Sequence, residues 1–338
     1  MKPIETKDSI AVIGAGSWGT ALAVLLARNS HPVSLWGRNR KKQKAMQQNR
    51  CNETYLPDIP FPDNLSIHLN IETALENINC ILLVVPSKGF KQTLEMIKPY
   101  FQPHIRIALA SKGLEPKTFS LLHDVVHEVL GEHTKICAIS GPTFAKEVAK
   151  GLPTALTVAS GDELYAHEIA AYLSNDRLRA YTSTDIIGVE LGGAIKNVIA
   201  IAAGIADGLG FGANTRAAVI TRGLAEITRL GIKLGGKQET FMGLAGLGDL
   251  VLTCTDNQSR NRRVGIGLAK GKSMEQILQE LGQVAEGVES ANKIHQLAIK
   301  HGIEMPIVEQ VNHVIQQNKS PMQAVQDLLG REVRSELY

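Results

Sequence analysis

The chain has 338 residues, enough for two domains of ordinary size, and 44% of them are hydrophobic, which is normal for a globular core. The formal net charge of +3 is too small to indicate a nucleic-acid-binding surface, and fits a local basic pocket for an anionic ligand. The 31 glycines cluster in short motifs, which argues against disorder and indicates tight turns and close backbone approaches.

The first half of the chain alternates predicted strands with predicted helices. Apolar, β-branched runs predict strands at 9–14, 33–36, 80–85, 105–110, 135–140, 154–159 and 178–182, and helical patterns separate most of them, beginning with 17–29 and 38–50. The segment 51–70 contains Pro57, Pro60 and Pro62 and is predicted to be an irregular connection. This alternation predicts an α/β fold with a mostly parallel sheet that carries helices on both faces.

After about residue 185 the pattern changes to helices alone. Helices are predicted at 186–208, 215–233, 260–270, 273–281, 287–301, 306–317 and 321–329. We therefore predict a doubly wound α/β domain over residues 1–187 and an all-helical domain over residues 188–338.

The turn after the first predicted strand carries a GxGxxG motif. Gly14, Gly16 and Gly19 form it between a buried strand and an apolar helix, which is the context that dinucleotide binding requires. Gly14 permits the tight turn, Gly16 lets the backbone approach a pyrophosphate, and Gly19 lets the helix pack on the strand. A strand–helix turn without a ligand is the alternative. We predict a Rossmann-type domain that binds NAD or NADP.

The residues after the second strand bear on the choice between these two cofactors. That strand commonly ends in an acidic residue that holds a ribose hydroxyl, but here it is followed by WGRNRKK. Arg38 can accommodate a 2′-phosphate, which favours acceptance of NADP. For Arg40, Lys41 and Lys42 a solvated helix start is an equally good interpretation.

Two buried charges are predicted in the helical half. Lys196 is the one charged residue in the apolar segment 191–206, and Asp249 is the one charged residue in 241–255. An ammonium buried without a partner is costly, so Lys196 needs a partner such as Asp249 and is a candidate acid or base. Asn197, beside it, would orient substrate or a water. The alternatives are a snorkelling lysine and an aspartate that caps the following helix.

Other polar residues stand where a phosphate ester would bind. Lys112 follows an apolar strand, and Ser140-Gly141-Pro142-Thr143 follows another, at the edge where α/β sheets bind ligands. Ser259, Arg260 and Asn261 open a helix and combine backbone N–H groups with a guanidinium, which suits a phosphate. For Lys112, and for Arg262 and Arg263, ordinary surface charge is the alternative.

Nothing in the sequence indicates export, a membrane or a metal. The four cysteines stand far apart, so we expect a reducing, cytoplasmic compartment and no disulfides. The N-terminus has no apolar signal segment, and no run of about 18 apolar residues predicts a membrane span. His123 and His127 lie one helical turn apart without the glutamate of a zinc-binding helix, so they are predicted on an exposed helix face.

The chain closely resembles the bacterial-type NAD(P)-dependent glycerol-3-phosphate dehydrogenases. The matching strings, IGAGSWGTALA, ASKGLE, ISGPTFAKEVAKGLPTA, GVELGGAIKNVIAIAAG, GFGANTRAA, GLAGLGDLVLTCT, SRNRR and VAEGVES, run in the family's order from about residue 10 to 310. The resemblance implies that the cofactor is bound by Ser17, Trp18, Arg38, Lys112, Ala145, Arg260, Val284 and Glu286. It implies a substrate site of Lys112, Gly141, Thr143, Lys196, Asn197, Asp249, Thr253, Ser259, Arg260 and Asn261, with Lys196 as the proton acceptor.

The activity that this resemblance implies is the reversible reduction of dihydroxyacetone phosphate to sn-glycerol 3-phosphate, which feeds glycerophospholipid synthesis. Lys196, Lys112 and Asp249 would be the catalytic residues, and no metal would be needed. The sequence leaves the oligomeric state open, and we favour a homodimer through the helical domain. Two alternatives stay open. One is a different two-domain dehydrogenase with a helix lysine, acting on a β-hydroxyacid or 6-phosphogluconate; the other is a non-catalytic dinucleotide sensor.

Overall fold

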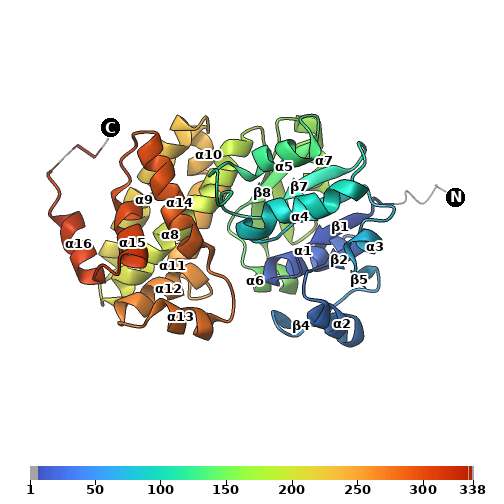
Figure 1. Cartoon of the computed structure of the whole chain (residues 1–338), viewed down its shortest axis with the longest axis horizontal. Helices are drawn as coiled ribbons and strands as arrows, with labels where there is room; N and C mark the ends of the chain where they lie inside the picture. Colours follow the sequence, from blue (N-terminus) through green and yellow to red (C-terminus); the bar gives the residue numbers. More distant parts are fainter. Residues whose placement is uncertain (1–6, 334, 337–338) are drawn as a thin grey trace. The chain divides into compact units, whose positions relative to one another are not determined.

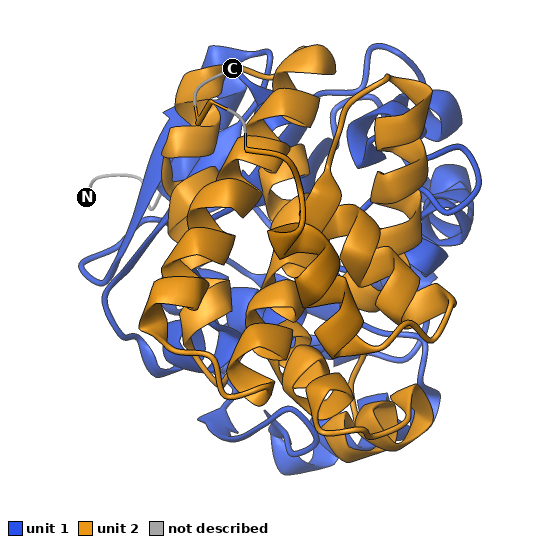
Figure 2. Ribbon diagram, turned by 90° about the vertical axis from the view of Figure 1, so that its left-hand side faces the viewer, with its two compact units in different colours: residues 1–190 blue, residues 191–338 orange. Residues whose placement is uncertain are grey.

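The structure, a computed structural model, describes residues 7–333, 335 and 336. The chain divides into two compact units, residues 1–190 and 191–338 (Figure 2). Unit 1 contains every strand of the described chain, and the described part of unit 2 is helical throughout.

An eight-stranded sheet forms the centre of unit 1, with strand order β10-β9-β8-β7-β6-β1-β2-β5. The strands are β1 (Ile10–Ile13), β2 (Val33–Trp36), β5 (Leu65–His68), β6 (Cys80–Leu83), β7 (Arg106–Leu109), β8 (Ile136–Ser140), β9 (Thr154–Ala159) and β10 (Leu178–Ser183). Neighbouring strands pair in parallel except β8 and β9, which pair antiparallel. The order runs outward from β1 in both directions, which confirms the predicted doubly wound fold.

Helices cover both faces of this sheet, as the alternation of side chains along β1 requires. Ile10 and Val12 pack into one core with α1 (Ser17–Arg28), α6 (Ala145–Lys150) and α7 (Glu163–Leu173). Ala11 and Ile13 pack into the opposite core with α3 (Ile71–Ala74), α4 (Phe90–Ile97) and α5 (Leu122–Leu130) (Figure 1). Every side chain of β1 therefore lies in one of two apolar cores, which explains the unbroken hydrophobic run of this strand.

The prediction of an irregular connection over 51–70 is wrong. After α2 (Arg40–Asn49), the strands β3 (Cys51–Asn52) and β4 (Leu56–Pro60) form a separate antiparallel ribbon, and β5 pairs in parallel with β2 at the sheet edge. The prolines suggested a loop, but a ribbon outside the main sheet and an edge position both tolerate residues that cannot donate to a ladder.

Unit 2 consists of α8 (Ile186–Gly208), most of which lies in this unit, and the helices that follow it. They are α9 (Ala213–Lys233), α10 (Gln238–Met242), the π-helical turn η3 (Leu244–Gly248), α11 (Asp249–Thr255), α12 (Arg260–Ala269), α13 (Met274–Leu281), α14 (Glu286–Lys300), α15 (Pro306–Gln316) and α16 (Pro321–Leu329). The sequence pattern predicts no helix over α10 and η3, because glycines interrupt the helical period, and only the alternative of Asp249 as a cap implies α11.

The central helix of unit 2 is α8. By length and composition it could cross a membrane, but 83% of its most apolar window is buried inside the structure, which is the burial of a core helix. Small residues let other backbone approach it closely. A side chain at Gly204 would overlap the backbone of Arg262 in α12, and one at Gly192 would lie 2.6 Å from the backbone oxygen of Ala245.

Candidate active site

The glycine-rich turn between β1 and α1 has the geometry that its spacing predicts. Gly14 has a φ of +126°, and a side chain there would lie 2.5 Å from the backbone oxygen of Val84. A side chain at Gly19 would overlap the backbone oxygen of Gly14, so only glycine lets α1 pack this closely. At Gly16, beyond its own chain neighbours, no described residue places an atom within 4 Å of where a side chain would begin. The turn is therefore closely packed against the protein at Gly14 and Gly19, and it has open space at Gly16.

The residues around this turn fit a dinucleotide. Ser17 is the first residue of α1, whose N-cap, Gly16, makes no side-chain capping bond. The indole Nε1 of half-buried Trp18 is buried and has no hydrogen-bond partner among the described residues. Arg38 is exposed just after β2, and its guanidinium lies against Gly89, in the short 3₁₀ helix that follows β6. Uncapped N–H groups and a nearby cation make this edge of the sheet suitable for phosphates.

The other predicted residues of unit 1 follow the neighbouring strands β7 and β8. Lys112 is half-buried in the loop after β7. Gly141 follows β8 with a φ of +154°, and a side chain there would lie 2.8 Å from the Cα of Leu156. Thr143 donates to the backbone oxygen of Gly141 at 3.2 Å, and Ala145 begins α6. The sheet topology therefore gathers these residues at the carboxyl ends of its central strands, the edge at which open α/β sheets bind ligands.

Lys196 and Asp249 form a buried ion pair in unit 2. Lys196 is 6% exposed in the middle of α8, and Asp249 is 1% exposed at the start of α11. The ammonium donates to Oδ1 of Asp249 and, at 2.9 Å, to Oγ1 of Thr253. The Thr253 hydroxyl donates in turn to the backbone oxygen of Asp249 at 2.6 Å. The lone lysine and lone aspartate of two apolar segments are thus each other's partners.

The π-helical turn η3 positions Asp249. It packs on α8 at Gly192, where a side chain would lie 2.6 Å from the backbone oxygen of Ala245, and on α10 at Gly246, where a side chain would overlap the backbone of Phe241. Asp249 is the first residue of α11 and Gly248 is its N-cap, so the sequence-based alternative of Asp249 as the cap is wrong. Cys254 lies in the same helix, and burial raises the pKa of its thiol to about 12 even though nearby Lys196 lowers it. The Cys254 thiol is therefore protonated at neutral pH.

A network of side-chain amides joins α8, α12 and α14. Asn261 donates from Nδ2 to Oδ1 of Asn197 at 2.9 Å, and its own Oδ1 accepts from the N–H of Gly287 at 2.9 Å. Ser259 is the N-cap of α12 and accepts from the N–H of Arg262 at 3.2 Å. Arg260, half-buried in the first turn of α12, donates to Oε1 of Gln283 at 3.2 Å. Val284, which is 45% exposed, and Glu286, which begins α14, follow Gln283 in the chain.

Two side chains that the sequence assigns to the surface, those of His123 and Arg262, lie in partly or fully buried ion pairs. His123 bonds to Glu190 in α8; burial alone would lower the pKa of His123, but the Glu190 carboxylate raises it above its ordinary value. Arg262 is 8% exposed and pairs with Asp207 of α8 at 2.6 Å, whereas Arg263 is exposed as predicted. The sequence shows that these side chains can carry charge, but it does not show the partners that lie far from them along the chain.

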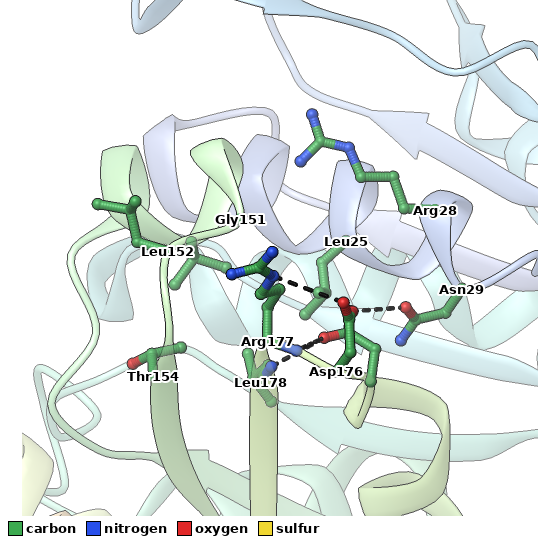
Figure 3. Close-up of a pocket in the computed structure, with 11 residues that line it drawn as sticks. Leu25, Arg28, Asn29, Gly151, Leu152, Thr154, Asp176, Arg177 and Leu178 are labelled. Atoms are coloured by element: carbon green, nitrogen blue, oxygen red, sulfur yellow. Dashed lines mark hydrogen bonds and ion pairs between the residues drawn. The ribbon is translucent and has the colours of Figure 1, made fainter.

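Two cavities, one in each unit, are lined by residues other than the predicted ones. One of about 190 Å³ in unit 1 is lined by Arg28, Asn29, Thr154 and Arg177 among others, and Arg177 pairs with the exposed Asp176 (Figure 3). A larger one of about 770 Å³ in unit 2 lies among side chains of α8, α9, α15 and α16. Among the described residues, no three His, Cys, Asp or Glu side chains are grouped to hold a metal. The candidate functional residues are the glycine-rich turn in unit 1 and the buried Lys196–Asp249 pair in unit 2.

A dinucleotide-binding turn on a doubly wound sheet, combined with a buried lysine–carboxylate pair in an all-helical unit, is the architecture of a nicotinamide-dependent dehydrogenase. Family models confirm this class and narrow it. The N-terminal model of NAD-dependent glycerol-3-phosphate dehydrogenase matches residues 9–166, and the C-terminal model matches residues 185–326. The chain belongs to the NAD-dependent glycerol-3-phosphate dehydrogenase family.

Individual relatives agree over the full length. NAD(P)-dependent glycerol-3-phosphate dehydrogenases are 53% identical in Pseudoalteromonas translucida, over 97% of this chain and 98% of that one, and 54% identical in Psychromonas ingrahamii, over the same shares. The crystal structure of the Coxiella burnetii enzyme is 48% identical, covers 96% of this chain and 100% of its own, and superposes with a TM-score of 0.94. A D-mandelate dehydrogenase at 16% identity and a TM-score of 0.63 shares the fold alone.

Proposed function

We propose that the protein interconverts dihydroxyacetone phosphate and sn-glycerol 3-phosphate with NAD or NADP. The observation that carries the proposal is the buried ion pair of Lys196 and Asp249, with Thr253 beside them, in a unit that matches the C-terminal part of this dehydrogenase family. An apolar helix has no structural need for an ammonium at its centre, and a charge held there at a cost is typical of catalytic sites.

Unit 1 would hold the cofactor. Gly14, Gly16 and Gly19 shape the turn, and the cofactor-binding residues would be Ser17, Trp18, Arg38, Lys112 and Ala145, with Arg260, Val284 and Glu286 from unit 2. When bound, a nicotinamide dinucleotide supplies or accepts the hydride of the reaction. Arg38 is exposed where an acidic residue would repel a 2′-phosphate, which supports acceptance of NADP alongside NAD.

The first turn of α12 would bind the substrate's phosphate. Ser259 caps the helix by accepting from the N–H of Arg262, and the half-buried guanidinium of Arg260 donates to Gln283, which precedes α14. The positive end of a ten-residue helix adds to that charge. Asn197 and Asn261 hold α12 against α8 and α14 and so keep this turn in place. Gly141 and Thr143 complete the substrate-binding set.

Lys196 would move the proton. In reduction its ammonium gives a proton to the oxygen that becomes the hydroxyl at C2, and in oxidation its amine accepts that proton. Asp249 and Thr253 fix the position of Nζ, and the Asp249 carboxylate stabilises the charged form of the lysine. Lys112 would add positive charge where negative charge develops on the reacting oxygen.

Substitution of Lys196 tests this assignment. Lys196→Met keeps an unbranched side chain of similar length and removes the transferable proton, so we expect turnover to fall by about 10²–10⁴-fold. Lys233→Met, at an exposed position on α9, is the control for loss of one positive charge. Steady-state rates with dihydroxyacetone phosphate and NADPH give the result, and thermal unfolding checks the fold. Near-normal turnover by a folded Lys196→Met protein would remove the central role of this residue.

We also propose that the protein works in the cytoplasm as a homodimer and supplies sn-glycerol 3-phosphate for glycerophospholipid synthesis. Its four cysteines are free in the structure, which suits a reducing compartment. Sedimentation of the purified protein measures the oligomeric state, and a monomer at micromolar concentration would contradict the homodimer.

A further inference from the structure

The side chain of Asn52 reaches the glycine-rich turn from outside the doubly wound sheet. Asn52 is 3% exposed and belongs to β3, in the ribbon that follows α2. Its Nδ2 donates to the backbone oxygen of Ala15 at 3.2 Å and to Oγ1 of Thr20 at 2.8 Å. A carbonyl oxygen can only accept, so the contact with Ala15 also settles which side of the amide is the nitrogen.

The bond to Ala15 orients the peptide that leads into Gly16. In a trans peptide the C=O and N–H groups point to opposite sides. Since Asn52 holds the carbonyl of Ala15, the N–H of Gly16 is directed away from Asn52. The next N–H groups are those of the first turn of α1, the end of the helix that suits an anion.

The backbone oxygen of Gly16 accepts from the N–H of Thr20 at 2.9 Å, and Asn52 adds a constraint on the peptide that precedes Gly16. Gly16 has no side chain, and beyond its own chain neighbours no described residue places an atom within 4 Å of where one would begin, so side-chain packing does not hold it. Glycine also has the widest choice of backbone conformations. A hydrogen bond from a buried amide to the adjoining peptide removes much of that freedom before any ligand arrives.

The ribbon that carries Asn52 is itself fixed. The backbone oxygen of Asn52 accepts from the N–H of Tyr55 at 3.1 Å, and the Tyr55 hydroxyl accepts from Nζ of Lys42 in α2 at 3.2 Å. Tyr55 packs against the same core as Ala15 and Trp18. Asn52 is therefore a rigidly mounted donor.

We propose that Asn52 is a positioning residue for the dinucleotide, which holds the Ala15–Gly16 peptide in the orientation that binds the pyrophosphate. The proposal rests on the proposed function, because it needs a cofactor in this turn. The hydrogen bond from Asn52 to Thr20 has a different role, since it connects the β3–β4 ribbon to α1 beyond the turn.

Two substitutions separate these bonds. Asn52→Leu keeps the size of the side chain and leaves the carbonyl of Ala15 without its donor, so we expect NADPH to bind roughly tenfold more weakly. Thr20→Val removes the hydroxyl that accepts the second bond and leaves the bond to Ala15 intact. It should lower the melting temperature and leave the dissociation constant of NADPH unchanged. Calorimetric titration with NADPH measures both proteins without any turnover.

Kinetics provide an independent check. For Asn52→Leu, KM for NADPH should rise by about the same factor as the dissociation constant, while kcat at saturating cofactor and KM for dihydroxyacetone phosphate stay unchanged. Should Asn52→Leu fail to fold, Asn52→Ala removes the same donor with a smaller change in shape, and the same weakening is expected.

Either of two results would overturn the proposal. One is a folded Asn52 variant with an unchanged dissociation constant for NADPH, and the other is an equal loss of affinity in Thr20→Val, which would make the effect a general loosening of α1. A wild-type protein that binds neither NADPH nor NADH would instead contradict the proposed function, and the role of Asn52 would fall with it.

Discussion

Lys196 is held by two acceptors that lie one helical turn apart on α11. Asp249 and Thr253 are at positions i and i+4, so both side chains face α8, and the threonine hydroxyl is fixed in turn by its bond to the backbone oxygen of Asp249. This arrangement satisfies a buried ammonium and fixes its position at the same time. A proton donor that is already oriented needs no reorganisation during the reaction.

Glu226 is a second buried charge, with a consequence for pH dependence. It is 2% exposed on α9, and it accepts from the N–H groups of Ile307 at 2.7 Å and Val308 at 3.2 Å, in the first turn of α15. Burial raises the pKa of its carboxyl to about 7, although these two bonds oppose the shift. The folded protein therefore holds a proton that the unfolded chain releases at lower pH.

We expect the stability contributed by Glu226 to be lost as the pH rises. The contribution is complete below the ordinary pKa of a glutamate and disappears as the pH approaches 7, a change on the order of 2 kcal/mol between about pH 5 and pH 7. Denaturant unfolding of the wild type and of Glu226→Gln across this range isolates the effect, because the variant keeps the shape and does not titrate. A stability difference between the two proteins that is independent of pH would contradict the raised pKa.

At the scale of elements, the turn between β1 and α1 separates two uses of glycine. Gly19 is needed for packing, because a side chain there would overlap the backbone oxygen of Gly14. Gly16 has extended backbone angles and open space, so an alanine would fit the free protein. Its need for glycine arises only if a ligand approaches the backbone.

This difference predicts opposite effects from two similar substitutions. Gly19→Ala should destabilise the protein by about 1–3 kcal/mol or more through overpacking. Gly16→Ala should change the free energy of unfolding little and weaken NADPH binding roughly tenfold or more, because its methyl group would stand where the pyrophosphate approaches. Thermal unfolding and calorimetric titration of both variants measure the two quantities. Unimpaired NADPH binding by Gly16→Ala would place the pyrophosphate elsewhere.

The elements show how far sequence reasoning reaches. The helix over 186–208 could be predicted to the residue from its unbroken apolar character, and Lys196 could be singled out as the charge that this helix must satisfy. The ribbon β3–β4 could not be predicted, because its prolines are typical of loops. The bonds from Asn52 to Ala15 and from Arg262 to Asp207 could not be predicted either, since long-range contacts leave no period in a single sequence.

For the whole molecule, the two units divide the chemistry. Unit 1 carries the residues suited to a dinucleotide, and unit 2 carries the ion pair suited to proton transfer. Family models of this dehydrogenase match both units, which weighs against a dinucleotide sensor without catalysis. The matches to relatives over 96–97% of the chain likewise weigh against the carboxylate substrates of other two-domain dehydrogenases.

The most direct test is to mix the purified protein with dihydroxyacetone phosphate and follow the oxidation of NADPH and of NADH in parallel. We predict rapid oxidation that depends on dihydroxyacetone phosphate and is absent with 6-phosphogluconate or a β-ketoacid, and a substantial rate with NADPH if Arg38 accommodates the 2′-phosphate. A folded protein that binds NADPH but oxidises neither cofactor in the presence of dihydroxyacetone phosphate would contradict the account.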